Sequence, residues 1–175
     1  VQFSSPNETA VCNLASIVLQ KFVGKPDADR SVTEDGEENN SHRRVEYTGI
    51  SGQRFYFDHD KLFYVTSVAT KNLNRIIDGN TYPLDCARES NVKHRPIGLG
   101  VQGLADAFQL MKLPFDSPEA RRLNRDIFET MYFAALSASC ELAERDGAYE
   151  SYDGSPASLG MFQQDLWKKA HGDLA

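Results

Sequence analysis

The pattern of apolar and polar residues is most regular between positions 93 and 111. Residues 97–101 read I-G-L-G-V, so branched apolar residues alternate with glycine at the two-residue period of a strand. One face of this strand is apolar, and the other is bare backbone that another segment or a ligand can approach closely. After Gly103 the apolar residues change to helical spacing from Leu104 to Met111. The pattern therefore predicts a strand followed directly by a helix.

A longer helix is predicted upstream of this strand. It follows the segment R-F-Y-F at 54–57, and Asp58 or Asp60 is expected to be its N-cap. Its apolar residues recur at helical spacing over positions 62–77. The D-G-N sequence at 78–80 is typical of a helix end. From there we expect a loop through Cys86 that leads to the strand.

The clearest helix signal begins at Ser117. Ser117 is a suitable N-cap, Pro118 fits the first turn because its missing N–H is not needed there, and Glu119 favours the positive end of the helix dipole. Gly147 is a plausible C-cap residue. Cys140 lies within this helix among small residues, and we expect it to be a core residue rather than a reactive thiol.

The remaining segments carry weaker patterns. Residues 10–14 are predicted to form a buried strand, and residues 14–22 a short helix that continues it. Residues 24–53 are acidic and have almost no large apolar side chains, so we expect a flexible, solvated insertion there. The tail at 149–175 is rich in turn residues. Two strands among helices indicate an α/β protein, and two parallel strands alone make a poor fold, so a fragment of a larger one is expected.

Composition narrows the function classes. The 175 residues are 41% hydrophobic with a net charge of −6, which supports a packed core and argues against nucleic acid or an anionic membrane as the main partner. No signal peptide and no run of roughly 18 apolar residues is present. Three widely spaced cysteines fit a reducing, cytoplasmic location and exclude a cysteine-based zinc site within the chain. The four histidines are also far apart in the sequence and do not have the spacing of metal ligands.

Gly98, Gly100 and Gly103 spell G-x-G-x-x-G, the fingerprint of dinucleotide binding. That chemistry needs the glycines in the turn between a strand and a helix, where phosphate meets the helix N-terminus. Here Gly98 and Gly100 fall within the predicted strand, and no hydrophobic strand precedes them. A dinucleotide-binding oxidoreductase module is therefore an alternative interpretation, and a non-catalytic α/β scaffold segment is another.

The chemically interesting side chains also have ordinary explanations. The basic residues Lys93, His94 and Arg95 could bind phosphate, but cations at a strand end that face water or pair with carboxylates are the favoured interpretation. Cys12 lies in the predicted buried strand beside the polar Asn13. By spacing alone it is a core cysteine, because burial without cationic neighbours does not activate a thiol.

Several collinear motifs resemble one family. The segment A-V-C-N-L-A-S at 10–16 and the run H-R-P-I-G-L-G-V-Q-G-L-A-D at 94–106 resemble the large, catalytic subunit of class I ribonucleotide reductase of the eukaryotic type. The segments N-L-N-R-I-I-D at 72–78, F-E-T at 128–130 and G-S-P-A-S at 154–158 are also similar. The resemblance covers nearly the whole chain except residues 24–53, where this sequence is longer.

The resemblance implies a fold. The family has a ten-stranded α/β barrel with helices packed outside and a central loop that carries a radical cysteine. Residues 1–175 would then be part of the barrel domain and would supply about two of its strands, with the acidic insertion at 24–53. The segment 97–102 would be one barrel strand, and Cys12 would lie on another, facing the interior.

The resemblance also implies a chemistry. The family reduces ribonucleoside diphosphates to 2′-deoxyribonucleoside diphosphates for DNA synthesis by thiyl-radical chemistry, with a pair of redox cysteines as the electron source. Cys12 matches one member of this pair, whose partner cysteine lies outside this chain. The resulting disulfide is reduced again by thioredoxin or glutaredoxin through thiol–disulfide exchange.

Other parts of the family machinery have no counterpart in these 175 residues. The radical-cysteine loop, the substrate-phosphate loop, and the regions that bind ATP and deoxynucleotide effectors are expected elsewhere in the complete subunit. The diiron-tyrosyl radical belongs to the small subunit, so no cofactor is expected in this chain. The implied partners are the diphosphate substrate, the small subunit and further copies of the large subunit. We expect the isolated chain to have no reductase activity.

Overall fold

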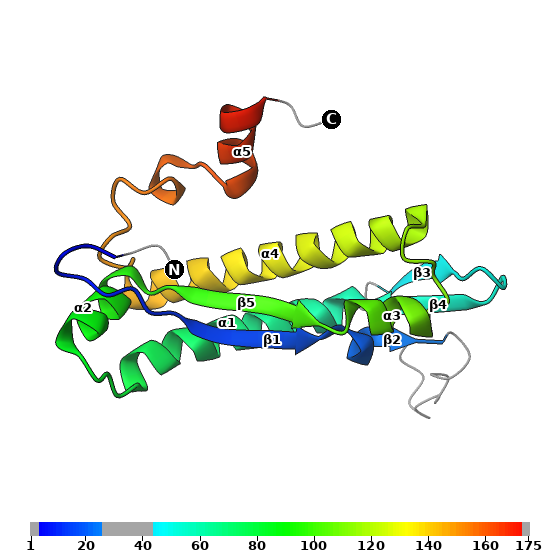
Figure 1. Cartoon of the computed structure of the whole chain (residues 1–175), viewed down its shortest axis with the longest axis horizontal. Coiled ribbons are helices and arrows are strands. Elements are labelled where there is room, and N and C mark those ends of the chain that lie inside the picture. The colour runs from blue at the N-terminus through cyan, green and yellow to red at the C-terminus, as the bar shows by residue number, and fades with distance from the viewer. Residues whose placement is uncertain (1–3, 26–43, 173–175) are drawn as a thin grey trace.

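Long helices form one layer of the structure, and two small sheets lie against it (Figure 1). The computed structural model describes residues 4–25 and 44–172. The helices are α1 (His59–Gly79), α2 (Asp85–His94), α3 (Leu104–Leu110), α4 (Pro118–Asp146) and α5 (Gln163–His171), with short 3₁₀ turns η1 (Leu19–Phe22) and η2 (Ala157–Leu159). The strands are β1 (Asn13–Val18), β2 (Val23–Gly24), β3 (Arg44–Thr48), β4 (Arg54–Asp58) and β5 (Ile97–Gln102).

The parallel pair of β1 and β5 is the centre of the fold. Its register runs from Asn13 opposite Ile97 to Val18 opposite Gln102. The predicted strand at 97–102 is confirmed at both ends. The upstream strand begins three residues later than predicted, because its partner β5 starts directly after Pro96, which has no N–H to extend the ladder. The predicted short helix at 14–22 is therefore mostly strand, with only η1 as a helical turn.

A second sheet was not predicted. It is antiparallel, in the order β2-β4-β3. Residues 54–57, expected only to lead into a helix, form β4. The predicted flexible insertion extended too far, because β3 and the following turn order residues 44–53 and Tyr47 is only 3% exposed. The part of that insertion from 26 to 43 lies outside the described residues.

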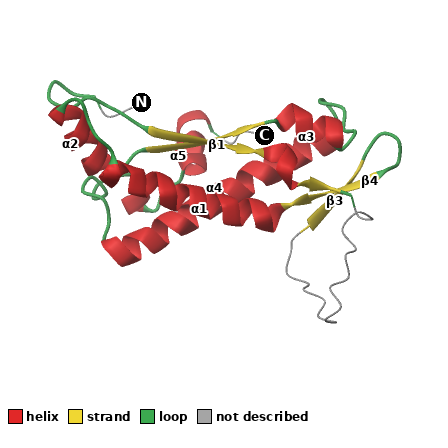
Figure 2. Ribbon diagram, turned by 90° about the horizontal axis from the view of Figure 1, so that it is seen from below, coloured by secondary structure: helices red, strands yellow, loops and turns green. Residues whose placement is uncertain are grey.

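The helices α1 and α4 pack along each other, and α1 also packs against both sheets (Figure 2). Their predicted N-caps are confirmed. The Asp58 carboxylate accepts a hydrogen bond from the backbone N–H of Lys61 at 2.9 Å, and the Ser117 hydroxyl accepts one from Ala120 at 3.1 Å. The buried core joins residues of these helices with η1, the sheets and α3, including Leu19, Phe57, Leu62, Met111, Leu123 and Ile127.

Two further predictions were wrong, and the one for the tail was incomplete. The expected loop through Cys86 is the helix α2, whose buried residues Ala87, Ser90 and Asn91 are small or polar and give no apolar stripe. The turn-rich tail contains the helix α5. Cys140 is exposed rather than in the core, because α4 buries Ala134 and Ala138 on its other side.

Candidate functional site

The parallel pair β1–β5 has one covered face and one open face. On β1 the exposed Leu14 and Ser16 alternate with Ala15 and the buried Ile17. Ile17, with Leu99 and Val101 of β5, belongs to the core, and α1 packs on both strands. Figure 1 shows α1 behind the pair, so the viewer sees the other face.

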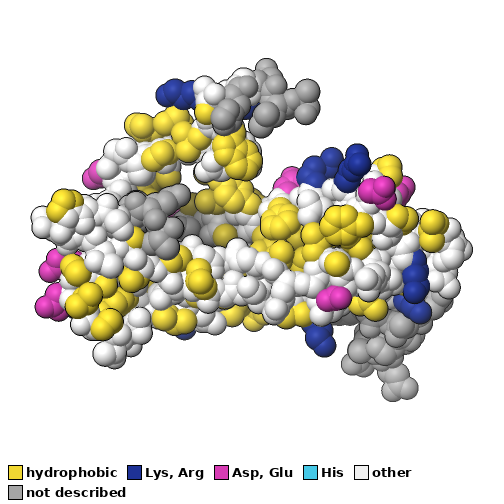
Figure 3. Space-filling view, in the orientation of Figure 1, with side chains coloured by type: hydrophobic (Ala, Val, Ile, Leu, Met, Phe, Trp, Pro, Cys, Tyr) yellow, Lys and Arg dark blue, Asp and Glu magenta, His cyan; other side chains and the backbone are white. Residues whose placement is uncertain are grey.

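The open face carries small and polar groups along its middle. The register places Gly98 opposite Leu14 and Gly100 opposite Ser16, so the backbone of β5 is bare there. The space-filling view shows a largely white band across this region with hydrophobic side chains on either side (Figure 3). Leu14 is 76% exposed on this face. The predicted lack of side chains on one face of the strand at 97–102 is therefore confirmed at Gly98 and Gly100, although Leu14 of the neighbouring strand covers Gly98.

Cys12 lies at the edge of this open face. It directly precedes β1, one residue outside the strand on which it was predicted, and it is half-buried with a free thiol. Its Sγ donates a weak hydrogen bond to the carbonyl of Asn13 at 3.6 Å. A Cβ built on Gly98 would lie 3.5 Å from this Sγ. The thiol therefore lies beside the bare backbone of β5.

The three glycines of the G-x-G-x-x-G motif do not form a phosphate-binding loop. Gly98 and Gly100 lie inside β5, and only Gly103 lies in the turn before α3, with φ of 76°. A Cβ at Gly103 would overlap with Oε1 of Gln20, so this side chain already occupies the space beside the turn. The α3 helix is only seven residues long. The dinucleotide-binding alternative is therefore not supported.

The basic residues before β5 are paired with carboxylates, as predicted. Lys93 Nζ lies 3.0 Å from Oε1 of Glu8, and His94 Nε2 lies 3.3 Å from the same oxygen. The hydrogen bond from Lys93 holds the pKa of Glu8 below its usual value. His94 Nδ1 is also 2.8 Å from the Ser151 hydroxyl. These contacts join the segment before Cys12 to the end of α2 and to the loop after α4.

Arg95 is paired with the end of α1. Its guanidinium donates to Asp78 and Asn74, and the hydrogen bonds to Asp78 hold the pKa of that carboxyl below its usual value. Sequence reasoning did not find Glu8, Asp78 or Ser151 as partners of the basic residues. No local signal could have found them, because each contact joins segments far apart in the chain.

The other two cysteines lie on helices. The Cys86 Sγ on α2 is 3.4 Å from the Thr9 hydroxyl, and Cys140 is exposed on α4. Within the described ranges, no three His, Cys, Asp or Glu side chains are grouped so as to hold a metal ion. No helix in the described part of the chain is long and apolar enough to cross a membrane.

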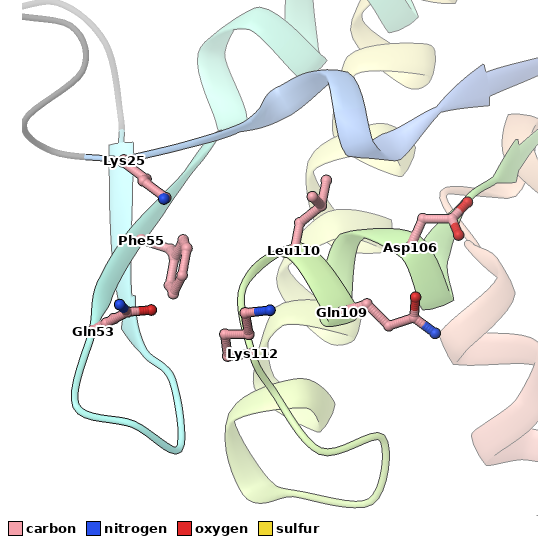
Figure 4. Close-up of a pocket in the computed structure, with 7 residues that line it drawn as sticks. All are labelled: Lys25, Gln53, Phe55, Asp106, Gln109, Leu110 and Lys112. Atoms are coloured by element: carbon pink, nitrogen blue, oxygen red, sulfur yellow. The ribbon is translucent and has the colours of Figure 1, made fainter.

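A cavity of about 500 Å³ lies away from Cys12, between β4 and α3 (Figure 4). Lys25, Gln53 and Phe55 line one wall, and side chains from α3 and the turn after it line the other. Neither Cys12 nor the glycines of β5 contribute to it. The thiol is therefore placed on an open surface of the described chain rather than in this cavity.

A parallel strand pair backed by helices on one face defines the class of this structure, a part of an α/β fold. Residues 1–174 match the family described as ribonucleotide reductase, barrel domain. The chain belongs to this family. The family resemblance identified in the sequence is thereby confirmed.

Curated relatives agree with the family match. The chain is 52% identical over 173 residues to the ribonucleoside-diphosphate reductase large subunit of Arabidopsis thaliana, covering 99% of this chain and 20% of the relative. It is 49% identical over 167 residues to the large chain 2 of Saccharomyces cerevisiae, covering 95% and 17%. The chain therefore spans about one fifth of the length of the curated relatives it matches.

A solved structure is also similar. The alpha subunit of the class Id ribonucleotide reductase of Actinobacillus ureae superposes with a TM-score of 0.56 at 27% identity. The match covers 84% of this chain and 23% of that chain. These comparisons thus relate the 175 residues to a portion of a larger subunit.

Proposed function

We propose that this chain is the part of a class I ribonucleoside-diphosphate reductase large subunit that carries one redox-active cysteine, Cys12. Relatives at about half identity carry the name of this enzyme. The observation that best supports the role of Cys12 is its position: the half-buried thiol borders Gly98, where only the tip of Leu14 covers the β5 backbone, on the face that α1 does not cover. A thiol that exchanges with other sulfurs needs such access.

The proposed chemistry uses Cys12 as one half of a two-electron donor. Cys12 and a second thiol outside this chain each lose a proton and an electron, and a disulfide bond forms between their sulfurs. The ribonucleoside diphosphate gains two electrons and two protons in total. One proton leaves with the 2′-hydroxyl as water, and the other ends as hydrogen on the 2′ carbon in place of the hydroxyl. A dithiol reductant of the thioredoxin or glutaredoxin type then attacks the disulfide and restores both thiols.

In this proposal the open face of β1–β5 is directed to the interior of the ten-stranded barrel of the complete subunit. Leu14 supports this assignment, because a leucine that is 76% exposed in the described chain would be covered by the other barrel strands. In this proposal β1 and β5 are two of the barrel strands, and α1 and α4 are part of the outer helical layer.

The remaining family components are proposed to lie outside these residues. The small subunit would hold the diiron-tyrosyl radical that supplies the oxidising equivalent, and ATP and deoxynucleotide effectors would bind elsewhere in the complete large subunit. That subunit would form homo-oligomers and act in the cytoplasm. For the isolated 175 residues we expect no deoxynucleotide formation, because the disulfide requires the second thiol.

The test is the substitution Cys12→Ser in the complete large subunit, assayed with its small subunit. We expect multiple-turnover reduction with a thioredoxin-type donor to be lost, because a serine hydroxyl cannot form the disulfide. Cys140→Ser is the matched control, since this thiol is exposed on α4 and has no role in the proposal, so turnover should stay unchanged. Unchanged steady-state turnover in Cys12→Ser would refute the role.

A further inference from the structure

Gly98, Leu14 and the Cys12 thiol meet at one point on the open face. A Cβ built on Gly98 would overlap with Cδ2 of Leu14 and would lie 3.5 Å from Sγ of Cys12. The tip of Leu14 therefore rests directly on the β5 backbone, in the place that any other residue at position 98 would need for its side chain. The Sγ of Cys12 borders the same place on the strand.

The second glycine of the strand provides a comparison. Gly100 lies on the same face, two residues further along β5, opposite Ser16. A Cβ built there would be 3.9 Å from the Ser16 hydroxyl, which is an ordinary van der Waals contact. The close packing is therefore particular to position 98 and does not follow from the open face in general.

A methyl group at position 98 would change the surroundings of the thiol through Leu14. The leucine tip would have to leave its place on the backbone and turn across the open face. Because the Cys12 Sγ borders that place, the displaced side chain would crowd the surface from which another sulfur must reach the thiol. Thiol–disulfide exchange requires direct access to the attacked sulfur, so this crowding would slow it.

We infer that Gly98 is a positioning residue for Cys12: it seats Leu14 flat against β5 and so keeps the thiol open to its partner sulfur. This inference rests on the proposed function. The step that it assists is the formation of the disulfide, in which two thiols lose two protons and two electrons to the substrate, and the later reopening of that disulfide by a dithiol reductant.

The test compares Gly98→Ala with Gly100→Ala in the complete large subunit. Multiple-turnover kcat should fall by about tenfold or more in Gly98→Ala, as small misplacements at a reacting group do, and change by less than about twofold in Gly100→Ala. The second measurement is the alkylation rate of Cys12 by iodoacetamide in the reduced enzyme, followed on its peptide by mass spectrometry. Crowding lowers this rate, whereas a damaged fold would raise it, so a lowered rate with an unchanged melting temperature is expected.

A double variant separates the mechanism from a general loss of packing. Leu14→Ala removes the overlap, so Leu14→Ala/Gly98→Ala should recover the turnover and alkylation rate of Leu14→Ala alone. Equal kcat in wild type and Gly98→Ala would overturn the inference, and so would a double variant that stays impaired or faster alkylation in Gly98→Ala. Full turnover in Cys12→Ser would instead refute the proposed function, while the alkylation measurement would still report on Gly98.

Discussion

The guanidinium of Arg95 donates two parallel hydrogen bonds to the carboxylate of Asp78, Nη1 to Oδ1 at 2.9 Å and Nη2 to Oδ2 at 2.7 Å. The same side chain donates to the Asn74 side-chain oxygen at 2.7 Å and to the Asn74 carbonyl at 2.9 Å. Arg95 itself adopts a left-handed backbone conformation with φ of 46°. These contacts fix the last turn of α1 to the residue that leads into β5.

Because the planar guanidinium of Arg95 donates two parallel hydrogen bonds to Asp78, we predict that lysine cannot replace it without a loss of stability. Arg95→Lys keeps the charge but loses the paired hydrogen bonds, so we expect the free energy of unfolding to fall by about 1–2 kcal/mol. Urea denaturation monitored by circular dichroism measures this change. Arg145→Lys is the control, because Arg145 pairs with the adjacent Asp146 at an exposed site, so this substitution should leave the free energy of unfolding nearly unchanged. Equal losses in the two variants would contradict the prediction.

Tyr47 of β3 predicts a loss of stability at alkaline pH. Burial, together with the nearby Asp126 carboxylate, raises the pKa of Tyr47, whose hydroxyl donates to Asp126 Oδ2 at 3.2 Å. The folded state thus holds the proton more tightly than the unfolded state. The stabilisation is present below the unfolded pKa of about 10 and is lost as pH rises above it.

The substitution Tyr47→Phe tests this expectation. It should lower the free energy of unfolding at pH 7 by about 0.5–1.5 kcal/mol through the lost hydrogen bond, and it should flatten the decline of stability above about pH 10. Tyr64→Phe serves as the control because Tyr64 is 68% exposed. If wild type and Tyr47→Phe decline in parallel above pH 10, the buried hydroxyl is not responsible.

Replacing Gly103 by alanine should lower the free energy of unfolding more than the same change at an ordinary helix-boundary glycine. Gly103→Ala would force a Cβ onto the Gln20 amide oxygen and hold alanine at φ of 76°, so a loss of about 1–2 kcal/mol is expected from the left-handed backbone alone. Gly79→Ala at the end of α1 meets nothing within 4 Å and should stay within about 0.5 kcal/mol of wild type. Thermal unfolding of both variants distinguishes them, and a neutral Gly103→Ala would contradict the prediction.

The elements that sequence reasoning found are those whose signals are local. The strand β5 has its whole pattern in six residues, and the caps Asp58 and Ser117 act within three residues of themselves. The start of β1 depended instead on pairing with a distant strand that begins after Pro96. The helix α2 gave no signal because its buried residues are small or polar.

The candidate site shows the same division. Motif resemblance identified Cys12, but its place beside Gly98 depends on the register between β1 and β5, which no single segment encodes. For Arg95 the sequence predicted pairing with a carboxylate but not which one, because its partner Asp78 lies on α1, 17 residues earlier in the chain. Pairing between remote segments is the information that periodicity and capping rules do not contain.

The two-stranded sheet of β1 and β5 has a consequence for how these residues behave outside a larger subunit. In the described part of the chain each strand has a neighbour on one side only, so each presents unpaired backbone N–H and C=O groups along its outer edge. Such edges readily accept a further extended strand, from the same chain or from another molecule. Separated from the rest of a complete subunit, the 175 residues would therefore tend to self-associate edge to edge, and flanking strands that hydrogen-bond to both edges would protect them from aggregation.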